Sequence, residues 1–359
     1  MENKKQHYVP QFYLRNFGLD HHKGSINLCL KKDGKIIENA EIRNQAYKNY
    51  FYGQDQELEK EFAKFEDIVS KIIRQIIGNK KITQSASELL WIRYFTFFQY
   101  QRTLKQADDT NDFINSTIHS IADRDDSIKD KVKDLVFGYD KPILFSLKIL
   151  QKILPETLDL AVKIVINNSK WPFLTSDHPV VLYNQFLERK GKQGGHTGLK
   201  TKGLQVFFPL SPRVLLMYYD RNVYDVGAKN KLDTTTSQYD DIRQLNMLQT
   251  INCGNVFFFN NELDKKYINS IRNGGLKHSY YGTEHQAESK PKMNADGTES
   301  FILHTYHEPL KLGLTLSFVK ETLHAKNYKL TNWAVEIRDE SWRNSQNIVD
   351  FIPKNTTLD

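Results

Sequence analysis

Two short segments far apart in the chain hold residue types suited to acid–base and metal chemistry. The first contains His7, Pro10 and Gln11, and the second is Ser176-Asp177-His178-Pro179. The fixed φ of Pro10 makes its segment rigid, and the Gln11 amide can both donate and accept hydrogen bonds. Asp177 follows an apolar run, so its carboxylate is expected at a strand end, where α/β proteins often gather site residues. We therefore expect the two segments to meet in one site.

Each of these residues also has a purely structural interpretation. His7 and Gln11 would then satisfy buried backbone groups. Asp177 would close a turn before Pro179. The sequence leaves both interpretations open.

Charged and amide residues on two expected helices extend this site. Glu66 lies at the edge of the apolar face of the first helix, and Gln99 and Arg102 share one edge of the second. A buried guanidinium needs a carboxylate or a phosphate, so Arg102 is expected either to pair with Glu66 or Asp177 or to receive a phosphate. Arg93, which also lies among aromatic residues, poses the same question.

Together these residues suit metal-assisted hydrolysis of a phosphodiester. Asp177 and Glu66 supply the hard oxygen ligands that Mg²⁺ or Mn²⁺ prefers, and the metal makes a bound water nucleophilic. His7 completes the catalytic set, and Arg102 offsets charge on the scissile phosphate. The residues expected to bind the substrate are Gln11, Arg93, Arg102 and His178. The sequence thus predicts a nuclease or a related phosphodiester hydrolase, acting as a toxin or a phage-defence effector.

Other function classes remain open because the sequence contains no P-loop, nucleophile elbow, His-Glu-x-x-His or Rossmann fingerprint. In a non-enzymatic sensor that binds nucleic acid or protein, the same motifs are structural. The Gly/Lys-rich loop 190–200 and exposed aromatic residues then make the contacts, unless that loop is only a flexible hairpin excursion. Transfer to or from a nucleotide, such as ADP-ribosylation, is a third class.

Hydrophobic spacing predicts the elements that position these residues. Apolar residues recur every three or four positions between about 55 and 77, which predicts an amphipathic helix that Gly78 ends. A second helix is expected from Ser85, where Ser85-x-x-Glu88 resembles a capping box, and it should be buried because it is apolar nearly all round. Asp33-Gly34 predicts a hairpin between residues 26 and 37.

The character of the chain changes near residue 160. Short strands are expected at 162–166, 173–175, 180–182, 204–208, 214–218 and 256–259, with a helix at about 236–249. We therefore expect an α+β (mixed α/β) fold, in which a helical N-terminal half packs on a mostly antiparallel, sheet-rich C-terminal half. The expected regions are 1–158 and 159–359, with a polar, mobile insert near 282–299, and they form one interlocked unit.

Charge and composition favour a polyanionic partner. The 359 residues carry a formal net charge of +7, which suits nucleic acid or a nucleotide, although a merely solvated basic surface explains it equally well. A protein partner or a homo-oligomer is also compatible. Only Cys29 and Cys253 are present, the first residues lack an apolar leader, and no apolar run approaches 18 residues. We expect a cytoplasmic protein that does not enter a membrane.

Several of these motifs together resemble the uncharacterised bacterial family DUF4238. They are HYVPQFYLRNF at 7–17, Lys64-Phe65-Glu66, Gln99-x-x-Arg102-Thr103, Thr175-Ser176-Asp177-His178-Pro179-Val180 and Phe208-Pro209-Leu210-Ser211-Pro212. The resemblance covers roughly residues 7 to 260. It implies no established chemistry, so it supports the positions of the motifs more than their roles. The aromatic residues of 7–17 should be pinned into the core, because exposing them would leave a large apolar surface in water.

Overall fold

The computed structural model describes residues 4–19, 24–54, 56–83, 85–123, 125–192, 194–278, 285–307, 310–331 and 335–338. The helices are α1 (Gln11–Leu14), α2 (Gln56–Asn79), α3 (Ala86–Gln101), α4 (Leu104–Ala122), α5 (Asp126–Val132), α6 (Pro142–Ile153), α7 (Gln185–Arg189), α8 (Tyr239–Asn252), α9 (Lys265–His278) and α10 (Leu323–Asn327). The strands are β1 (Lys5–His7), β2 (Ser25–Leu30), β3 (Ile36–Glu41), β4 (Tyr47–Asn49), β5 (Ala161–Asn167), β6 (Thr175–Ser176), β7 (Val181–Tyr183), β8 (Gln205–Ser211), β9 (Val214–Tyr219), β10 (Tyr224–Val226), β11 (Asp233–Thr236), β12 (Val256–Phe259), β13 (His285–Met293), β14 (Glu299–His307) and β15 (Val319–Glu321).

A five-stranded sheet with the order β11-β5-β9-β8-β7 forms the centre of the molecule. Strands β5, β9, β8 and β7 pair antiparallel, and β11 pairs parallel with β5. Alternate residues of β9 enter different apolar clusters, Leu216 and Tyr218 on one face and Leu215 and Met217 on the other. A strand covered on both faces has no polar side, which explains why β9 reads as an unbroken apolar run.

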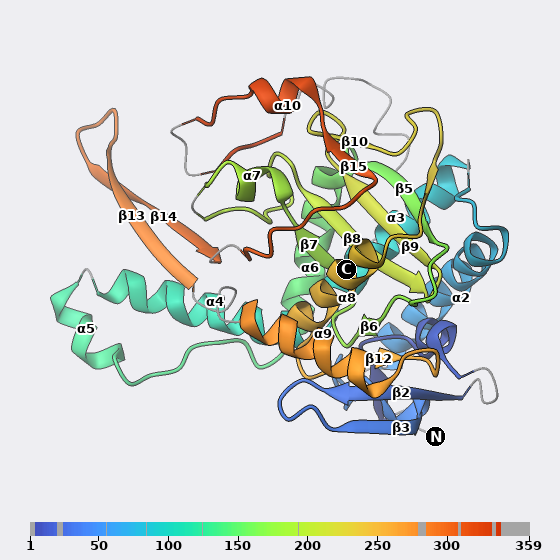
Figure 1. Cartoon of the computed structure of the whole chain (residues 1–359). Coiled ribbons are helices and arrows are strands. Elements are labelled where there is room, and N and C mark those ends of the chain that lie inside the picture. The colour runs from blue at the N-terminus through green and yellow to red at the C-terminus, as the bar shows by residue number, and fades with distance from the viewer. Residues whose placement is uncertain are drawn as a thin grey trace.

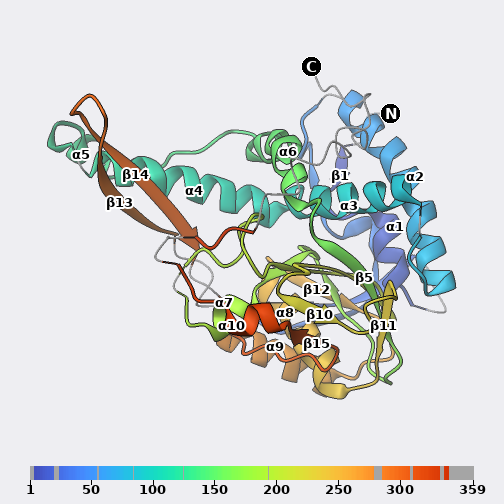
Figure 2. The same ribbon diagram turned by 90° about the horizontal axis from the view of Figure 1, so that it is seen from above.

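Helices cover both faces of this sheet. Figure 2 shows α2, α3 and α6 on one side of it and α8 on the other. Ile73 of α2 and Ile92 of α3 belong to the first apolar cluster, while Ile242 and Leu245 of α8 belong to the second. The apolar spacing between 55 and 77 and the nearly all-apolar sequence of α3 therefore match their buried positions, and the predicted α+β fold is confirmed.

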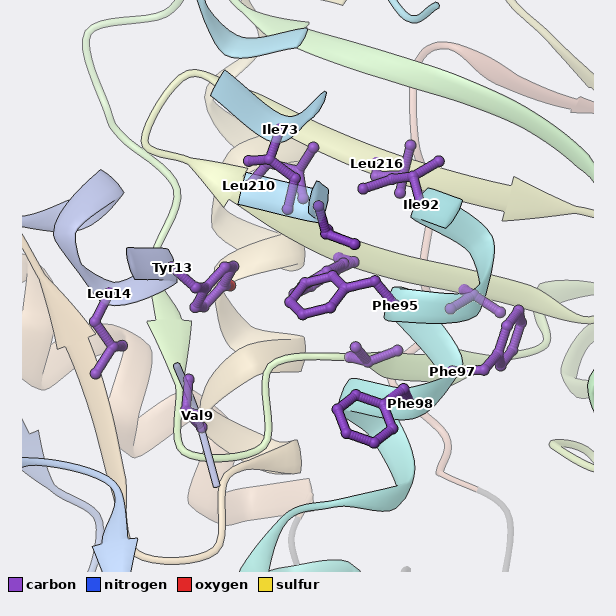
Figure 3. Close-up of a cluster of buried hydrophobic side chains, with 14 of the residues drawn as sticks. Val9, Tyr13, Leu14, Ile73, Ile92, Phe95, Phe97, Phe98, Leu210 and Leu216 are labelled. Carbon is purple, nitrogen blue, oxygen red and sulfur yellow. The ribbon is translucent and has the colours of Figure 1, made fainter. Parts of the chain in front are cut away.

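The aromatic segment near the N-terminus is pinned into the first cluster, as expected. Val9, Tyr13 and Leu14 belong to the same cluster as Phe95 and Phe98 of α3, and Figure 3 shows the three on one side of it. The hydroxyl of Tyr13 donates to the carbonyl of Pro209 at 2.6 Å and shares a 2.6 Å hydrogen bond with Oγ1 of Thr175. One buried tyrosine thus ties the N-terminal segment to β8 and to the start of the Ser176-Asp177 motif.

A second sheet, in the order β3-β2-β12-β6, joins strands from the two halves of the chain. The predicted hairpin is present as β2 and β3, and Gly34 has the positive φ of 75° that its turn needs. Strand β12 pairs on one edge with β2 and on the other with β6, where Phe257 faces Ser176. This pairing carries the motif after β6 toward the N-terminal segment.

Two predictions about local structure need correction. Ser85 is the N-cap of α3, but its side chain makes no capping hydrogen bond and instead contacts the Ser87 hydroxyl at 3.0 Å. The polar stretch predicted as a mobile insert contains the hairpin β13–β14, which turns at Gly297 with a φ of 78°. Residues 282–284 of that stretch lie outside the described residues. Among the described helices, none is long and apolar enough to cross a membrane.

Candidate functional site

Arg102 is the centre of a buried polar cluster at the end of α3. Its side chain is 0% exposed, and Nη1 lies 2.7 Å from Oε1 of Glu66, which is 25% exposed. Its Nε donates to Oε1 of Gln99 at 3.0 Å, and the guanidinium lies 4.8 Å from the ring centre of Phe98. The predicted contact between Arg102 and Glu66 is therefore present.

The guanidinium of Arg102 is not fully satisfied by these contacts. Nη1 is close enough to Glu66 for an ion pair, but its N–H bonds are not aligned for a hydrogen bond, so the attraction is mainly Coulombic. Nη2 has no hydrogen-bond partner among the described residues. An unsatisfied buried donor destabilises a fold by roughly 1–3 kcal/mol, so it marks a place where a ligand or water would bind favourably.

The same cluster holds the N-terminal motif in place. Nε2 of Gln99 donates to the carbonyl of Tyr8 at 2.9 Å, and the hydroxyl of Tyr52 donates to the carbonyl of His7 at 3.3 Å. Gln6 is fully buried and spans from the Tyr52 amide to the carbonyl of Gly53. The backbone of residues 6–8 is therefore fixed beside Arg102, which explains why the two motifs occur together.

His7 is neutral near pH 7, with one ring nitrogen able to accept a proton. Burial lowers its pKa, and the nearby charges of Arg102, Lys5 and Arg15 lower it further, against a weaker opposing effect of its hydrogen bond to Arg43. Nε2 lies 3.2 Å from the carbonyl oxygen of Arg43, which can only accept. The neutral ring must then carry its proton on Nε2, which leaves the lone pair on Nδ1.

Glu59 is a member of this cluster that sequence reasoning missed. It is half-buried and lies two helical turns before Glu66 on α2, on the same side of the helix. Burial raises its pKa, the negative charge of Glu66 raises it further, and Arg102 opposes both. The spacing of seven between the two glutamates was the available signal. We call His7, Tyr52, Glu59, Glu66 and Arg102 the Arg102 site.

Asp177 accepts hydrogen bonds from the backbone of the turn between α8 and β12. Oδ1 accepts from the Gly254 amide at 2.8 Å, and Oδ2 accepts from the amides of Asn255 at 2.7 Å and Val256 at 3.2 Å. Burial raises the pKa of Asp177, whereas the three N–H donors favour the ionised form. Both oxygens are thus occupied in joining β6 to β12.

His178 and Thr103 connect the Asp177 segment to the Arg102 site. Nδ1 of His178 lies 2.5 Å from Oγ1 of Thr103, the residue that follows Arg102 and caps α4. His178 is buried, and desolvation lowers its pKa to about 3. Burial raises the pKa of Tyr8, and interactions with Asp177 and Tyr52 raise it further. The Gln99-x-x-Arg102-Thr103 motif therefore contacts Glu66 on one side and His178 on the other.

Three amide side chains of α8 fix the Asp177 segment, and sequence reasoning missed all three. Asn246 contacts the backbone at Pro172 and Leu174, Gln249 contacts Ser176 and the carbonyl of Pro179, and Asn252 donates to the carbonyls of His178 and Val180. Their regular spacing of three places them on one face of α8. The signal was present in the sequence as amides recurring at every third residue of the helix.

The remaining predicted substrate-binding residues contact other parts of the fold. Arg93 donates from both terminal nitrogens to the carbonyls of Thr157 and Leu160, and it lies nine residues, roughly 13 Å, from Arg102 along the helix. Gln11 accepts a hydrogen bond from Arg15 at 3.0 Å. The Gly/Lys-rich loop is fastened to the C-terminal segment, since Lys190 donates to the carbonyls of Lys326 and Tyr328.

The predicted Mg²⁺ or Mn²⁺ site at Asp177 and Glu66 stays a prediction, and the two carboxylates do not fit a shared ion in this arrangement. Asp177 binds three backbone donors, and Glu66 faces a guanidinium whose positive charge repels a cation. Within the described ranges, no three His, Cys, Asp or Glu side chains gather closely enough to hold a metal. Two open clefts lie elsewhere, one at the end of α2 and one between α4 and residues 136–140.

His178 makes the stability of the fold sensitive to acid. Its pKa is about 3 in the folded chain and about 6.5 when exposed, so the unfolded chain binds the extra proton between these values. Stability is therefore complete above pH 6.5 and falls as the pH drops toward 3, by about 2 kcal/mol between pH 7.5 and 5. Asn can keep the hydrogen bond to Thr103 without titrating, so His178→Asn should flatten this slope by one proton.

Urea unfolding at pH 7.5 and pH 5 measures this effect. The matched control is His119→Asn, because His119 also bonds one residue through its ring but is partly exposed on α4. If the free energy of unfolding falls as much between pH 7.5 and 5 in His178→Asn as in the parent, His178 is not the buried group that titrates.

Comparisons with known proteins identify a family and nothing narrower. The family model described as protein of unknown function, DUF4238, matches residues 5–263. No curated protein matches the chain, and no solved structure does. The matched range contains the Arg102 site, the Asp177 segment and the turn that binds Asp177.

Proposed function

The chain belongs to the DUF4238 family, and we propose that it hydrolyses phosphodiester bonds of nucleic acid at the Arg102 site. The observation that carries this proposal is the buried guanidinium of Arg102, whose Nη2 is unsatisfied beside one paired carboxylate. A phosphate oxygen would supply the acceptor that this nitrogen lacks. Arginine suits such a ligand because its planar fork matches a phosphate and stays charged at any physiological pH.

Two other residues of the site have protonation states suited to acid–base catalysis. His7 is neutral with its lone pair on Nδ1, as a general base must be. Glu59 has a raised pKa, and a carboxyl group that holds its proton longer is a better general acid. Glu66 pairs with Arg102 at 2.7 Å and keeps the guanidinium oriented.

The proposed reaction follows from these states. His7 Nδ1 takes a proton from the attacking water, whose oxygen forms the new bond to phosphorus. Arg102 stabilises the negative charge that develops on the phosphoryl oxygens. The bond from phosphorus to the leaving oxygen breaks, and Glu59 donates its proton to that oxygen. Proton exchange with solvent then returns His7 to its neutral form and Glu59 to its protonated form.

The surface around the N-terminal segment supports a polyanionic substrate. Lys5, Arg15 and Lys48 are exposed there, and their contacts are with neutral groups: Lys5 with Asn44 and the Tyr47 ring, Arg15 with Gln11, and Lys48 with the Phe51 ring. Exposed cationic side chains attract a phosphate backbone, although Glu41 interacts electrostatically with Lys5 and Asp108 with Lys48. The two cysteines, both free and buried, suit a reducing compartment such as the cytoplasm, where we place this activity.

Cleavage assays on labelled single- and double-stranded DNA and RNA test the proposal, each with Mg²⁺, with Mn²⁺ and with a chelator. We expect His7→Gln and Arg102→Lys each to lower the cleavage rate at least ~100-fold, as is typical for loss of a general base or a charge-stabilising group. His119→Gln is the matched control for His7, since Nε2 of His119 also contacts a backbone carbonyl. If the enzyme is a toxin or defence effector, only the active forms should arrest growth when expressed.

Circular dichroism of each variant separates lost chemistry from lost folding. The hydrolase proposal fails if the parent cleaves none of the four substrates, or if folded His7→Gln and Arg102→Lys cleave at the parent rate. Salt-sensitive binding of nucleic acid without turnover would instead support the binding sensor.

A further inference from the structure

A long projection of the molecule takes no part in the site described above. We call residues 104–140 the arm; it contains α4, α5 and the segment that leads toward α6. In Figures 1 and 2 α4 and α5 extend away from the central sheet, and the hairpin β13–β14 runs beside them. Leu104 and Ala107 at the base of the arm reach the first apolar cluster, and the surface residues further along indicate what the arm meets.

The arm exposes an unusual share of large apolar side chains. Among the described residues, fourteen large hydrophobic side chains are exposed, and six lie in the arm: Phe113, Ile121, Ile128, Leu135, Val136 and Tyr139. Val136 is 89% exposed. Concentrated exposed apolar side chains, rimmed by charged ones, typically mark a protein–protein contact.

The apolar segment after α5 is held in a defined conformation. Asn111 of α4 accepts from the Tyr139 amide at 2.9 Å and donates to the Tyr139 carbonyl at 3.3 Å. Asn115, one turn further along, accepts from the Phe137 amide at 2.8 Å. These bonds hold residues 137–139 against α4. Leu135 and Val136, which lie just before them, are therefore presented outward by a fixed backbone.

The arm is acidic on an otherwise basic protein. It contains nine aspartates and five lysines or arginines, a net charge of −4, which leaves +11 on the rest of the chain. This charge repels nucleic acid, so the arm does not extend a nucleic-acid surface. A basic protein surface is the complementary partner.

This chain carries such a surface on α9. The helix contains Lys265, Lys266, Arg272 and Lys277 and no aspartate or glutamate, so its net charge is +4 with neutral histidine. Lys266 and Lys277 are exposed, while Ile268 and Ile271 face the core. The basic side of α9 therefore points outward, with Lys265 paired to Glu38 of β3 at 3.0 Å, and its charge is opposite in sign to that of the arm.

We infer that the arm of one copy docks on α9 of a second copy, and that the two copies exchange these contacts in a symmetric dimer. In a dimer with a two-fold axis, the contact between the arm of one copy and α9 of the other occurs twice. The assembly is then closed, and both arms are covered. The apolar side chains after α5 supply buried area, and the acidic side chains around them set the orientation on α9. The inference is independent of the proposed hydrolase activity.

A charge exchange between two variants tests the dimer most sharply. Asp126→Lys with Asp130→Lys changes the net charge of the arm from −4 to 0, and Lys266→Glu with Lys277→Glu changes that of α9 from +4 to 0; all four positions are exposed. Each double variant alone loses the opposite charges at both contacts and should be monomeric by light scattering after size exclusion. In an equal mixture the unchanged arm meets the unchanged α9 at one contact, and the substituted positions meet as opposite charges at the other, so a heterodimer should form.

A second pair of variants tests the apolar part of the contact. Leu135→Asp with Val136→Asp should yield a monomer, whereas Leu323→Asp, at a 78% exposed leucine on α10, should leave the dimer intact. Salt should weaken the parent dimer because its charged rim is screened. The inference is overturned if the unsubstituted protein is monomeric at tens of micromolar in low salt. The arm would then bind a different basic partner. A dimer unaffected by either set of variants overturns it as well.

Discussion

Replacing Asp177 with alanine lowers the free energy of unfolding by about 2–4 kcal/mol, because three backbone N–H groups lose their acceptor at once. The amides of Gly254, Asn255 and Val256 all point at this carboxylate, and no other side chain stands in its place. Asp177→Asn should fall between parent and alanine variant, since one of its two oxygens becomes a donor that faces N–H groups.

Urea denaturation at pH 7.5 checks this expectation, with Asp112→Ala as the control, since Asp112 is an exposed aspartate on α4. Cleavage measured per folded molecule provides the second readout. If Asp177 positions the turn and does no chemistry, folded Asp177→Asn should cleave at the parent rate. A stable Asp177→Ala variant that has lost only activity would return Asp177 to the catalytic role predicted from the sequence.

Replacing Glu66 with glutamine is expected to cost about 3 kcal/mol, because it leaves the fully buried guanidinium of Arg102 without its paired charge. Arg102→Met should cost less, since the carboxylate of Glu66 is partly exposed and can be hydrated once its partner is gone. The specific prediction is that Glu66→Gln lowers the free energy of unfolding more than Arg102→Met does. The variant that carries both changes should lose less stability than the sum of the two single losses.

Urea unfolding of the parent, Glu66→Gln, Arg102→Met and the double variant gives the interaction energy of the pair directly. Glu61→Gln is the matched control on the same helix, because Glu61 pairs with Lys64 at 2.6 Å but is 59% exposed. It should change stability very little. Equal effects of Glu61→Gln and Glu66→Gln would show that burial does not set the strength of the Arg102 pair.

The sequence predicted best what depends on repeated local patterns. Apolar spacing located α2 and α3, and the unbroken apolar runs located β8 and β9, because burial on both faces removes polar positions from a strand. The need for a counter-charge at Arg102 followed from burial of its helix, but the sequence left Glu66, Asp177 and a phosphate open as the partner, and the structure shows Glu66.

Other features had no readable signal. The partners of Asp177 are backbone amides 77 to 79 residues away, and backbone donors are the same for every residue type except proline. Residues 285–293, which form β13, were expected within a mobile insert because their polar composition resembles a loop, whereas the apolar residues 301–303 of β14 were expected as a strand; composition does not reveal that the two segments pair. Glu59, by contrast, had a signal in its spacing of seven from Glu66, but it was passed over because a single glutamate on a helix is usually solvated.

The sheet that joins β2 with β12 and β6 has a consequence for how the chain acquires its fold. Strand β2 is complete at residue 30, yet the strand that pairs with its second edge begins at residue 256. During synthesis, β2 and β3 therefore leave the ribosome as an unpartnered hairpin, and an isolated two-stranded hairpin is at best marginally stable. Such non-local pairing also slows folding, since the loop that it closes must be ordered first. Completion of this four-stranded sheet is thus a late event, possible only after residues 256–259 have been made.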